Sequence, residues 1–168
     1  MPNTIESIYR YPIKGLSGEP IDRIALTAGS VIPGDREYAL ARSNVEFDPA
    51  NPQYFEKTHF LSLVRDKKLA ELTTKFNNTL NKLSISRLGS VLIEVSLTSP
   101  RDCKRIADFF VEYLDMPAIK QPHIVRAIHG TKNHSFSDVP DKAISFINLS
   151  SILEFSKKVG MEIDPMRF

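Results

Sequence analysis

The chain has 168 residues, of which 42% are hydrophobic and 25% are charged. Its 22 basic and 20 acidic side chains leave a net charge of +2, so no global field indicates a nucleic acid or an acidic membrane as partner. No run approaches the roughly 18 apolar residues of a membrane helix, and the N-terminus lacks a secretory pattern. One cysteine allows no intramolecular disulfide, and together these features favour a cytoplasmic globular protein.

The first hundred residues have the pattern of short strands joined by tight turns. Alternating or short apolar runs between Gly, Pro and Ser predict strands over residues 5–9, 21–26, 37–41, 69–76, 82–87 and 91–97. Asn77-Asn78 and Gly89-Ser90 suit positive φ and are expected to form the turns of a meander with one buried face.

The strongest helix signal comes after this meander. Ser99 is a suitable N-cap, Pro100 suits the first helical position, and Asp102 suits the positive end of the helix dipole. Apolar residues then recur at helical spacing until Met116-Pro117, which predicts a helix that packs against the core.

The last third is expected to contain a strand, a polar connection and a second helix. Residues 124–128 predict the strand, residues 130–140 the connection, and residues 151–159 the helix. Ser151 and Glu154 form a possible capping box, and Gly160 would end the helix. The predicted fold class is α+β, a mostly antiparallel, barrel-like sheet with one or two packed helices.

Two cations lie at expected turns. Lys14 stands between a strand-like run and the Gly-rich residues 15–18, and Arg36 follows Pro33-Gly34. Cations held at strand ends are well placed to meet a phosphate or carboxylate. The alternative is that both are ordinary solvated turn residues. Asp35 is expected to orient Arg36 or to cap the turn.

Other reactive residue types give weaker signals. Cys103 lies one turn before the apolar residue Ile106, so it is expected to be a packing residue rather than a nucleophile. His123, His129 and His134 lack both the i, i+4 spacing and the cysteine partners of a zinc site. Surface histidines are the favoured interpretation.

The order of several short motifs resembles the MOSC family of molybdenum-cofactor proteins. Residues 9–16, 24–27 and 34–36 are similar to the β-barrel domain that precedes the MOSC domain, residues 136–138 and 147–152 to the opening of the MOSC domain, and residues 164–168 to the start of its Arg-Phe-Arg-Pro-Asn signature. The relatives include the mitochondrial amidoxime-reducing component and bacterial MOSC proteins fused to a ferredoxin-like domain. The resemblance implies an N-terminal domain over residues 1–128, then a linker and the truncated start of a MOSC domain over residues 129–168.

The resemblance also implies a set of cofactor-binding residues. Lys14 and Arg36 match positions that hold the phosphate and pyranopterin of the molybdenum cofactor, and Gly15 matches a position where relatives can carry serine. Ser150 or Ser151 would add polar contacts, although the capping box explains Ser151 without a ligand. No catalytic or metal-ligating residue is implied within these 168 residues, and pyridoxal phosphate is not expected.

One departure from the family limits the expected function. Family enzymes ligate molybdenum through a cysteine beyond the signature, whereas this sequence stops at Phe168, and Cys103 lies in the wrong segment. The expectation is therefore half of a cofactor pocket, inactive alone. Completed by the remainder of the MOSC domain, it would reduce N-hydroxylated substrates such as amidoximes with a ferredoxin-like or flavin electron donor. The alternative is a non-enzymatic interaction domain without cofactor.

Overall fold

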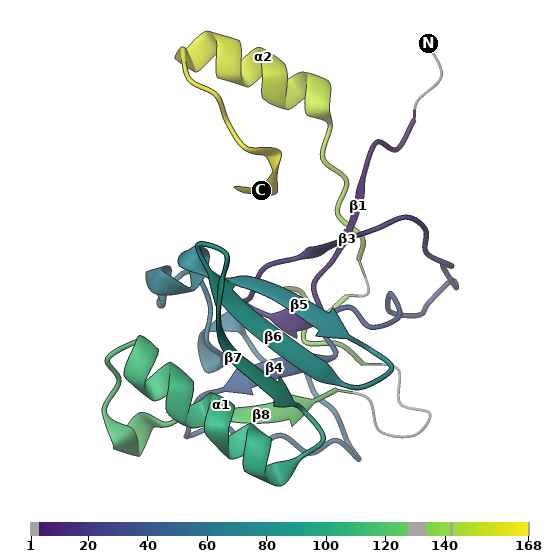
Figure 1. Cartoon of the computed structure of the whole chain (residues 1–168). Helices are drawn as coiled ribbons and strands as arrows, with labels where there is room; N and C mark the ends of the chain where they lie inside the picture. The colour runs from purple at the N-terminus through teal and green to yellow at the C-terminus, as the bar shows by residue number, and fades with distance from the viewer. Residues whose placement is uncertain (1–3, 128–133, 142, 168) are drawn as a thin grey trace.

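The computed structural model describes residues 4–127, 134–141 and 143–167. Within these ranges, eight strands in three sheets and two α-helices confirm the α+β class (Figure 1). The sheets pair β1 (Ile8–Arg10) with β3 (Glu19–Ile21), join β2 (Ile13–Lys14), β4 (Tyr38–Ala41) and β8 (His123–Arg126), and join β5 (Thr73–Asn77), β6 (Lys82–Arg87) and β7 (Ser90–Ser96). The described strands do not close into a single barrel. None of the described helices has the length and apolarity to cross a membrane.

Strand β4 lies at the centre of the molecule and separates two hydrophobic clusters. Because side chains alternate along a strand, Tyr38 and Leu40 face the larger cluster while Ala39 and Ala41 face a smaller, aromatic one. β2 pairs in parallel with β4, with Lys14 opposite Ala39. The sheet register therefore directs Lys14 to the aromatic cluster.

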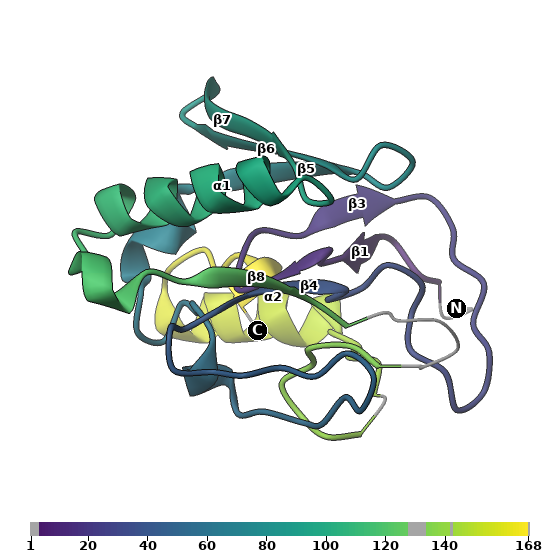
Figure 2. The same cartoon turned by 90° about the horizontal axis from the view of Figure 1, so that it is seen from below.

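The β5–β6–β7 meander and helix α1 (Pro100–Tyr113) form the larger cluster. The meander pairs in antiparallel register, and α1 lies between it and β8 (Figure 2). Ile106 and Phe110 of α1 are fully buried. Ser99 caps α1 as predicted, with its Oγ accepting from the Asp102 N–H at 3.3 Å. The predicted limits of β6 are also confirmed.

Two strand predictions are wrong over part of their length. Residues 22–26 are not a strand, and Leu26 is exposed. Residues 67–71 form the 3-10 helix η2 (Lys67–Glu71) instead. Leu69 and Leu72 are both buried, because a spacing of three residues places side chains on the same face of a 3-10 turn. Apolar runs of this length fit either a strand or a turn, and tertiary packing decides between them.

The first predicted strand is also displaced. Ile5 is exposed, and the strands here are β1 from Ile8 and the separate β2. The remaining short 3-10 helices are η1 (Lys57–His59), η3 (Ala118–Lys120) and η4 (Pro165–Arg167). Strand β8 starts at His123, one residue before the predicted start, while Ile128 lies outside the described residues.

Helix α2 (Leu149–Val159) begins two residues before its predicted start. Asn148 is its N-cap, with Oδ1 accepting from the Ser151 N–H at 3.2 Å, so the predicted capping box at Ser151 is wrong. Asn caps a helix about as well as Ser, and the earlier start brings Leu149 into the helix. Gly160 ends it in the left-handed conformation, as predicted. None of the side chains of α2 is buried, and the helix stands apart from the sheets (Figure 1).

The aromatic cluster brings a distant segment onto the first part of the chain. Phe136 is buried and packs with its ring centroid 5.2 Å from that of Phe60 and 4.9 Å from that of Phe47. The packed part of the chain therefore includes Phe136. The domain boundary predicted at residues 128–129 lies outside the described residues.

Candidate functional site

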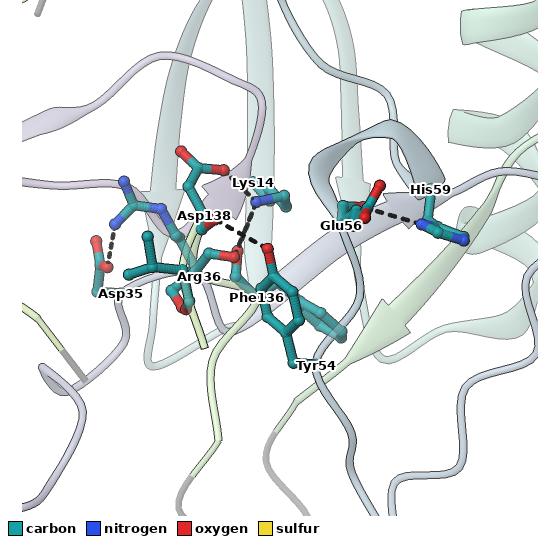
Figure 3. Close-up of polar contacts among 10 residues, drawn as sticks. Lys14, Asp35, Arg36, Tyr54, Glu56, His59, Phe136 and Asp138 are labelled. Carbon is teal, nitrogen blue, oxygen red and sulfur yellow. Dashed lines mark hydrogen bonds and ion pairs between the residues drawn. The ribbon is translucent and has the colours of Figure 1, made fainter. Parts of the chain in front are cut away.

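Lys14 is a buried cation whose ammonium group is fully used by one segment. Its side chain is 3% exposed, and Nζ donates to Phe136 O at 2.9 Å, to Ser137 O at 3.2 Å and to Asp138 Oδ1 at 2.5 Å (Figure 3). A lysine ammonium has three N–H donors, so these acceptors satisfy it. The alternative interpretation of Lys14 as a solvated turn residue is wrong. Residues 136–138 are called the strap from here on.

The charges around Lys14 favour a charged pair with Asp138. Burial lowers the pKa of Lys14, and the hydrogen bond and negative charge of Asp138 oppose this shift. Burial alone would raise the pKa of Asp138, but the hydrogen bond from Lys14 and the charges of Lys14, Arg36 and Lys57 outweigh it and lower this pKa. The ion pair with Lys14 is therefore the main favourable contact of the Asp138 carboxylate.

Arg36 is held from three directions in the turn before β4. Its backbone has a φ of 47°, and its N–H donates to Tyr11 O at 2.6 Å. The guanidinium lies 5.2 Å from the centroid of the Tyr11 ring, and its Nη1 pairs with Asp35 Oδ2 at 2.6 Å. Asp35 Oδ1 also accepts from the Tyr11 N–H at 2.8 Å. The prediction that Asp35 orients Arg36 is confirmed, and Arg36 itself remains partly exposed.

Gly15 occupies a position that only glycine can fill without strain. Its φ is +82°, and a Cβ placed on it would lie 2.3 Å from Leu61 O. This close approach packs residues 14–15 against residues 60–62. Ser62 Oγ is buried there, and no described residue forms a hydrogen bond with it. Whether Gly15 contacts a cofactor remains a prediction.

Three of the sequence motifs meet at this site. The strap contacts Lys14 across 124 residues of sequence. The Phe136 N–H also donates to Arg36 O at 2.9 Å, so the strap bridges the two predicted cations. Tyr54 fixes the far end of the strap, because its hydroxyl donates to Asp138 O at 3.0 Å (Figure 3).

Ser150 and Ser151 lie elsewhere. Both are exposed residues in the first turn of α2, which stands apart from the sheets (Figure 1). The Ser151 N–H is used by the helix cap. The structure therefore brings together Lys14, Gly15 and Arg36 but not these two serines, whose role toward a ligand remains a prediction.

Sequence reasoning missed two members of the site. Lys57 belongs to the 3-10 helix η1 and had no local signal, because one lysine in a polar loop is indistinguishable from a solvated one. Asp138 was part of a motif but had been given no role. Its position between Ser137 and Val139 in a polar connection gave no indication of a partner 124 residues earlier.

The metal-ligating residue types do not gather in the described ranges. No group of three or more His, Cys, Asp or Glu that could hold a metal is present there. The Cys103 thiol donates to Leu97 O at 3.4 Å, and burial raises its pKa, which disfavours the thiolate that ligates soft metals. Burial lowers the pKa of His123, His134 stacks on Phe47, and His129 lies outside the described residues.

Comparisons with known proteins give no match: no family model, no curated protein and no solved structure is similar to this chain. The function of the chain is therefore inferred from the contacts within the site and from the order of its motifs along the sequence. Two properties of the site matter most. It contains the cations Lys14 and Arg36, and it joins segments that lie 124 residues apart in the sequence.

Proposed function

We propose that this chain provides the phosphate-binding wall of a molybdenum-cofactor site, as the N-terminal part of a MOSC-type oxidoreductase of the cytoplasm. The observation that carries the proposal is the meeting of residues 11–15, 34–36 and 136–138 in one cationic site. The resemblance rested on the order of these motifs along the sequence. Segments that build a common site have a physical reason to occur together in one chain, and this supports the resemblance.

The side chains of the site suit the phosphate end of such a cofactor. Arg36 offers a planar, partly exposed guanidinium, the group best matched to a phosphate, and Lys57 offers a second exposed cation. When bound, the cofactor would supply the redox chemistry, while these residues would bind and orient its phosphate. No thiolate is available for the metal end of the cofactor, since Cys103 is a partly buried residue of α1 whose thiol donates to Leu97 O and whose pKa is raised by burial. The fit is to half of the cofactor.

The C-terminal segment supports a packing partner. Eight large apolar side chains of residues 143–167 are exposed: Ile144, Phe146, Ile147, Leu153, Phe155, Val159, Met161 and Met166. A single apolar side chain at a surface is normal, but a group of this size indicates an interface. The remainder of a MOSC domain is the proposed partner. Reduction of N-hydroxylated substrates with a ferredoxin-like or flavin donor is proposed for the completed enzyme.

One observation favours a second candidate function. The hydrogen bonds of Lys14 are satisfied by the strap, so this lysine has a structural role that requires no ligand. In an interaction domain without cofactor, Lys14 would fasten the strap and Arg36 would meet an acidic group of a protein partner. The two functions differ in whether the cation site binds a pterin phosphate.

The test is a fluorescence titration of the full chain with anaerobically prepared molybdopterin. We expect saturable binding that weakens about tenfold in Arg36→Gln, the loss expected for one charge-assisted hydrogen bond. Lys68→Gln is the control, because Lys68 is an exposed cation paired with Asp115 at the end of α1. No binding by the unaltered chain, or equal binding by Arg36→Gln, would contradict the proposal and favour the interaction domain.

A further inference from the structure

The strap closes the cation site as the structure stands. All three N–H donors of Lys14 are taken by acceptors on residues 136–138, and its side chain is 3% exposed. A ligand therefore cannot reach the ammonium while Asp138 remains in place. Arg36 is different, since its side chain is 29% exposed while it pairs with Asp35 and lies over the Tyr11 ring.

The group that closes the site is itself an oxyanion. The side chain of Asp138 is 61% exposed, so its carboxylate lies at the entrance while its partner lies inside. The Arg36 guanidinium lies on the same side of the strap as this carboxylate (Figure 3). One largely exposed carboxylate thus occupies the acceptor position next to the buried Lys14 ammonium.

We propose that Asp138 is a built-in competitor for the anion site: its carboxylate occupies the position of a ligand phosphate, and a phosphate-bearing ligand must displace it to reach Lys14. This inference rests on the proposed function and deepens it, because it makes binding conditional on a movement of the strap.

The contacts of the strap indicate which of its residues can move when a ligand binds. Phe136 is anchored in the aromatic cluster, with ring contacts to Phe47 and Phe60. Beyond it, Asp138 is held by its ion pair with Lys14 and by the hydrogen bond from Tyr54 to its carbonyl. The movement is therefore a hinge after Phe136 that breaks these contacts of Asp138. A phosphate dianion has more charge and more acceptor atoms than a carboxylate, so it can replace this group.

The test is a titration of the full chain with inorganic phosphate, followed by NMR or calorimetry. We expect Asp138→Asn to bind about tenfold more tightly than the unaltered chain, because the amide retains an acceptor for Lys14 but removes the competing charge. Asp141→Asn is the matched control, since no ion pair of Asp141 is found among the described residues. It should change the affinity less than twofold. Sulfate in a parallel titration distinguishes a site for phosphate from one for any tetrahedral oxyanion.

Two further variants keep the test decisive. Tyr54→Phe removes one contact of the strap and leaves every charge in place, so it should tighten phosphate binding by a smaller factor than Asp138→Asn. Arg36→Gln in the Asp138→Asn background should reverse most of the gain, because it removes the partly exposed cation of the site. Unchanged affinity in both Asp138→Asn and Tyr54→Phe, or equal tightening by Asp141→Asn, would overturn the inference.

This outcome is separate from that of the proposed function. If Asp138→Asn binds phosphate more tightly but the chain does not bind molybdopterin, the competitor is real and the cofactor assignment is wrong. If molybdopterin binds the unaltered chain and Asp138→Asn with equal affinity, the cofactor assignment is supported, and the proposal that Asp138 competes with the ligand is wrong.

Discussion

The packed body of the molecule and its C-terminal segment each contain a capped helix, but only the helix of the body buries side chains. In the body, residues 4–127 with the strap, α1 is capped by Ser99 and buries Ile106 and Phe110 against sheets. In the C-terminal segment, residues 143–167, α2 is capped by Asn148 and ended by Gly160, yet it buries no side chain. Caps and spacing define a helix, but only packing fixes its place in the fold. The cation site lies in the body, while the predicted serines lie on α2.

The largest difference between the two regions is expected when an aromatic ring is removed from each helix and the free energy of unfolding is compared. Phe110→Ala on α1 should lower the free energy of unfolding by about 3–5 kcal/mol, because it leaves a cavity in the core. Phe155→Ala on α2 removes the same group from an exposed position and should change it by less than about 0.5 kcal/mol. Urea denaturation measures both. Equal losses would mean that α2 is packed against the body.

Glycine substitutions test the close approach inside the body. Gly15 and Gly89 have nearly the same φ, +82° and +81°, but a Cβ would contact Leu61 O only at Gly15. Gly89→Ala should cost about 1–2 kcal/mol for its backbone conformation alone. Gly15→Ala should cost clearly more in the same thermal or urea measurement. A similar cost for both would show that residues 60–62 do not approach residue 15.

The two N-caps provide a smaller contrast. Ser99→Ala should lower the stability of the body by about 1 kcal/mol, since it removes the acceptor for the Asp102 N–H. Asn148→Ala removes the equivalent acceptor from α2. It should reduce helical circular dichroism without moving the main unfolding transition. A shift of that transition by Asn148→Ala would show that α2 unfolds together with the body.

The smallest expected effect is a pH dependence of the strap. The pKa of Asp138 is lowered in the folded chain, so its contribution to stability is complete above the unfolded value of about 3.9 and is lost as pH falls through the folded value. Because the carboxylate is largely exposed, we expect less than about 1 kcal/mol. Asp138→Asn should therefore show a shallower loss of stability below about pH 4. Identical acid profiles would indicate that Asp138 is unpaired in solution.

Local patterns predicted the elements whose limits depend on neighbouring residues. The alternation over 82–87 gave β6, and Ser99-Pro100 gave the start of α1. Where two local signals competed, the prediction failed. The predicted capping box at Ser151 overlooked Asn148, which caps α2, and the strand predicted from residue 69 overlooked the 3-10 turn η2.

The site was predictable only in part, because most of its contacts are non-local. The motifs pointed to Lys14 and Arg36 as a pair of cations. Nothing around residue 14 indicated that β4 would direct its side chain into an aromatic cluster or that a strap 124 residues later would cover it. Sequence position alone could not distinguish an open cation site from one closed by the chain itself.

A double-mutant cycle tests whether residue 14 and the strap form a single site. Lys14→Met, Asp138→Asn and the double variant are compared by urea denaturation. We expect a coupling of at least about 0.5 kcal/mol, because the two side chains share an ion pair at 2.5 Å. Additive losses that agree within about 0.3 kcal/mol would contradict it, since sites that do not touch show no coupling.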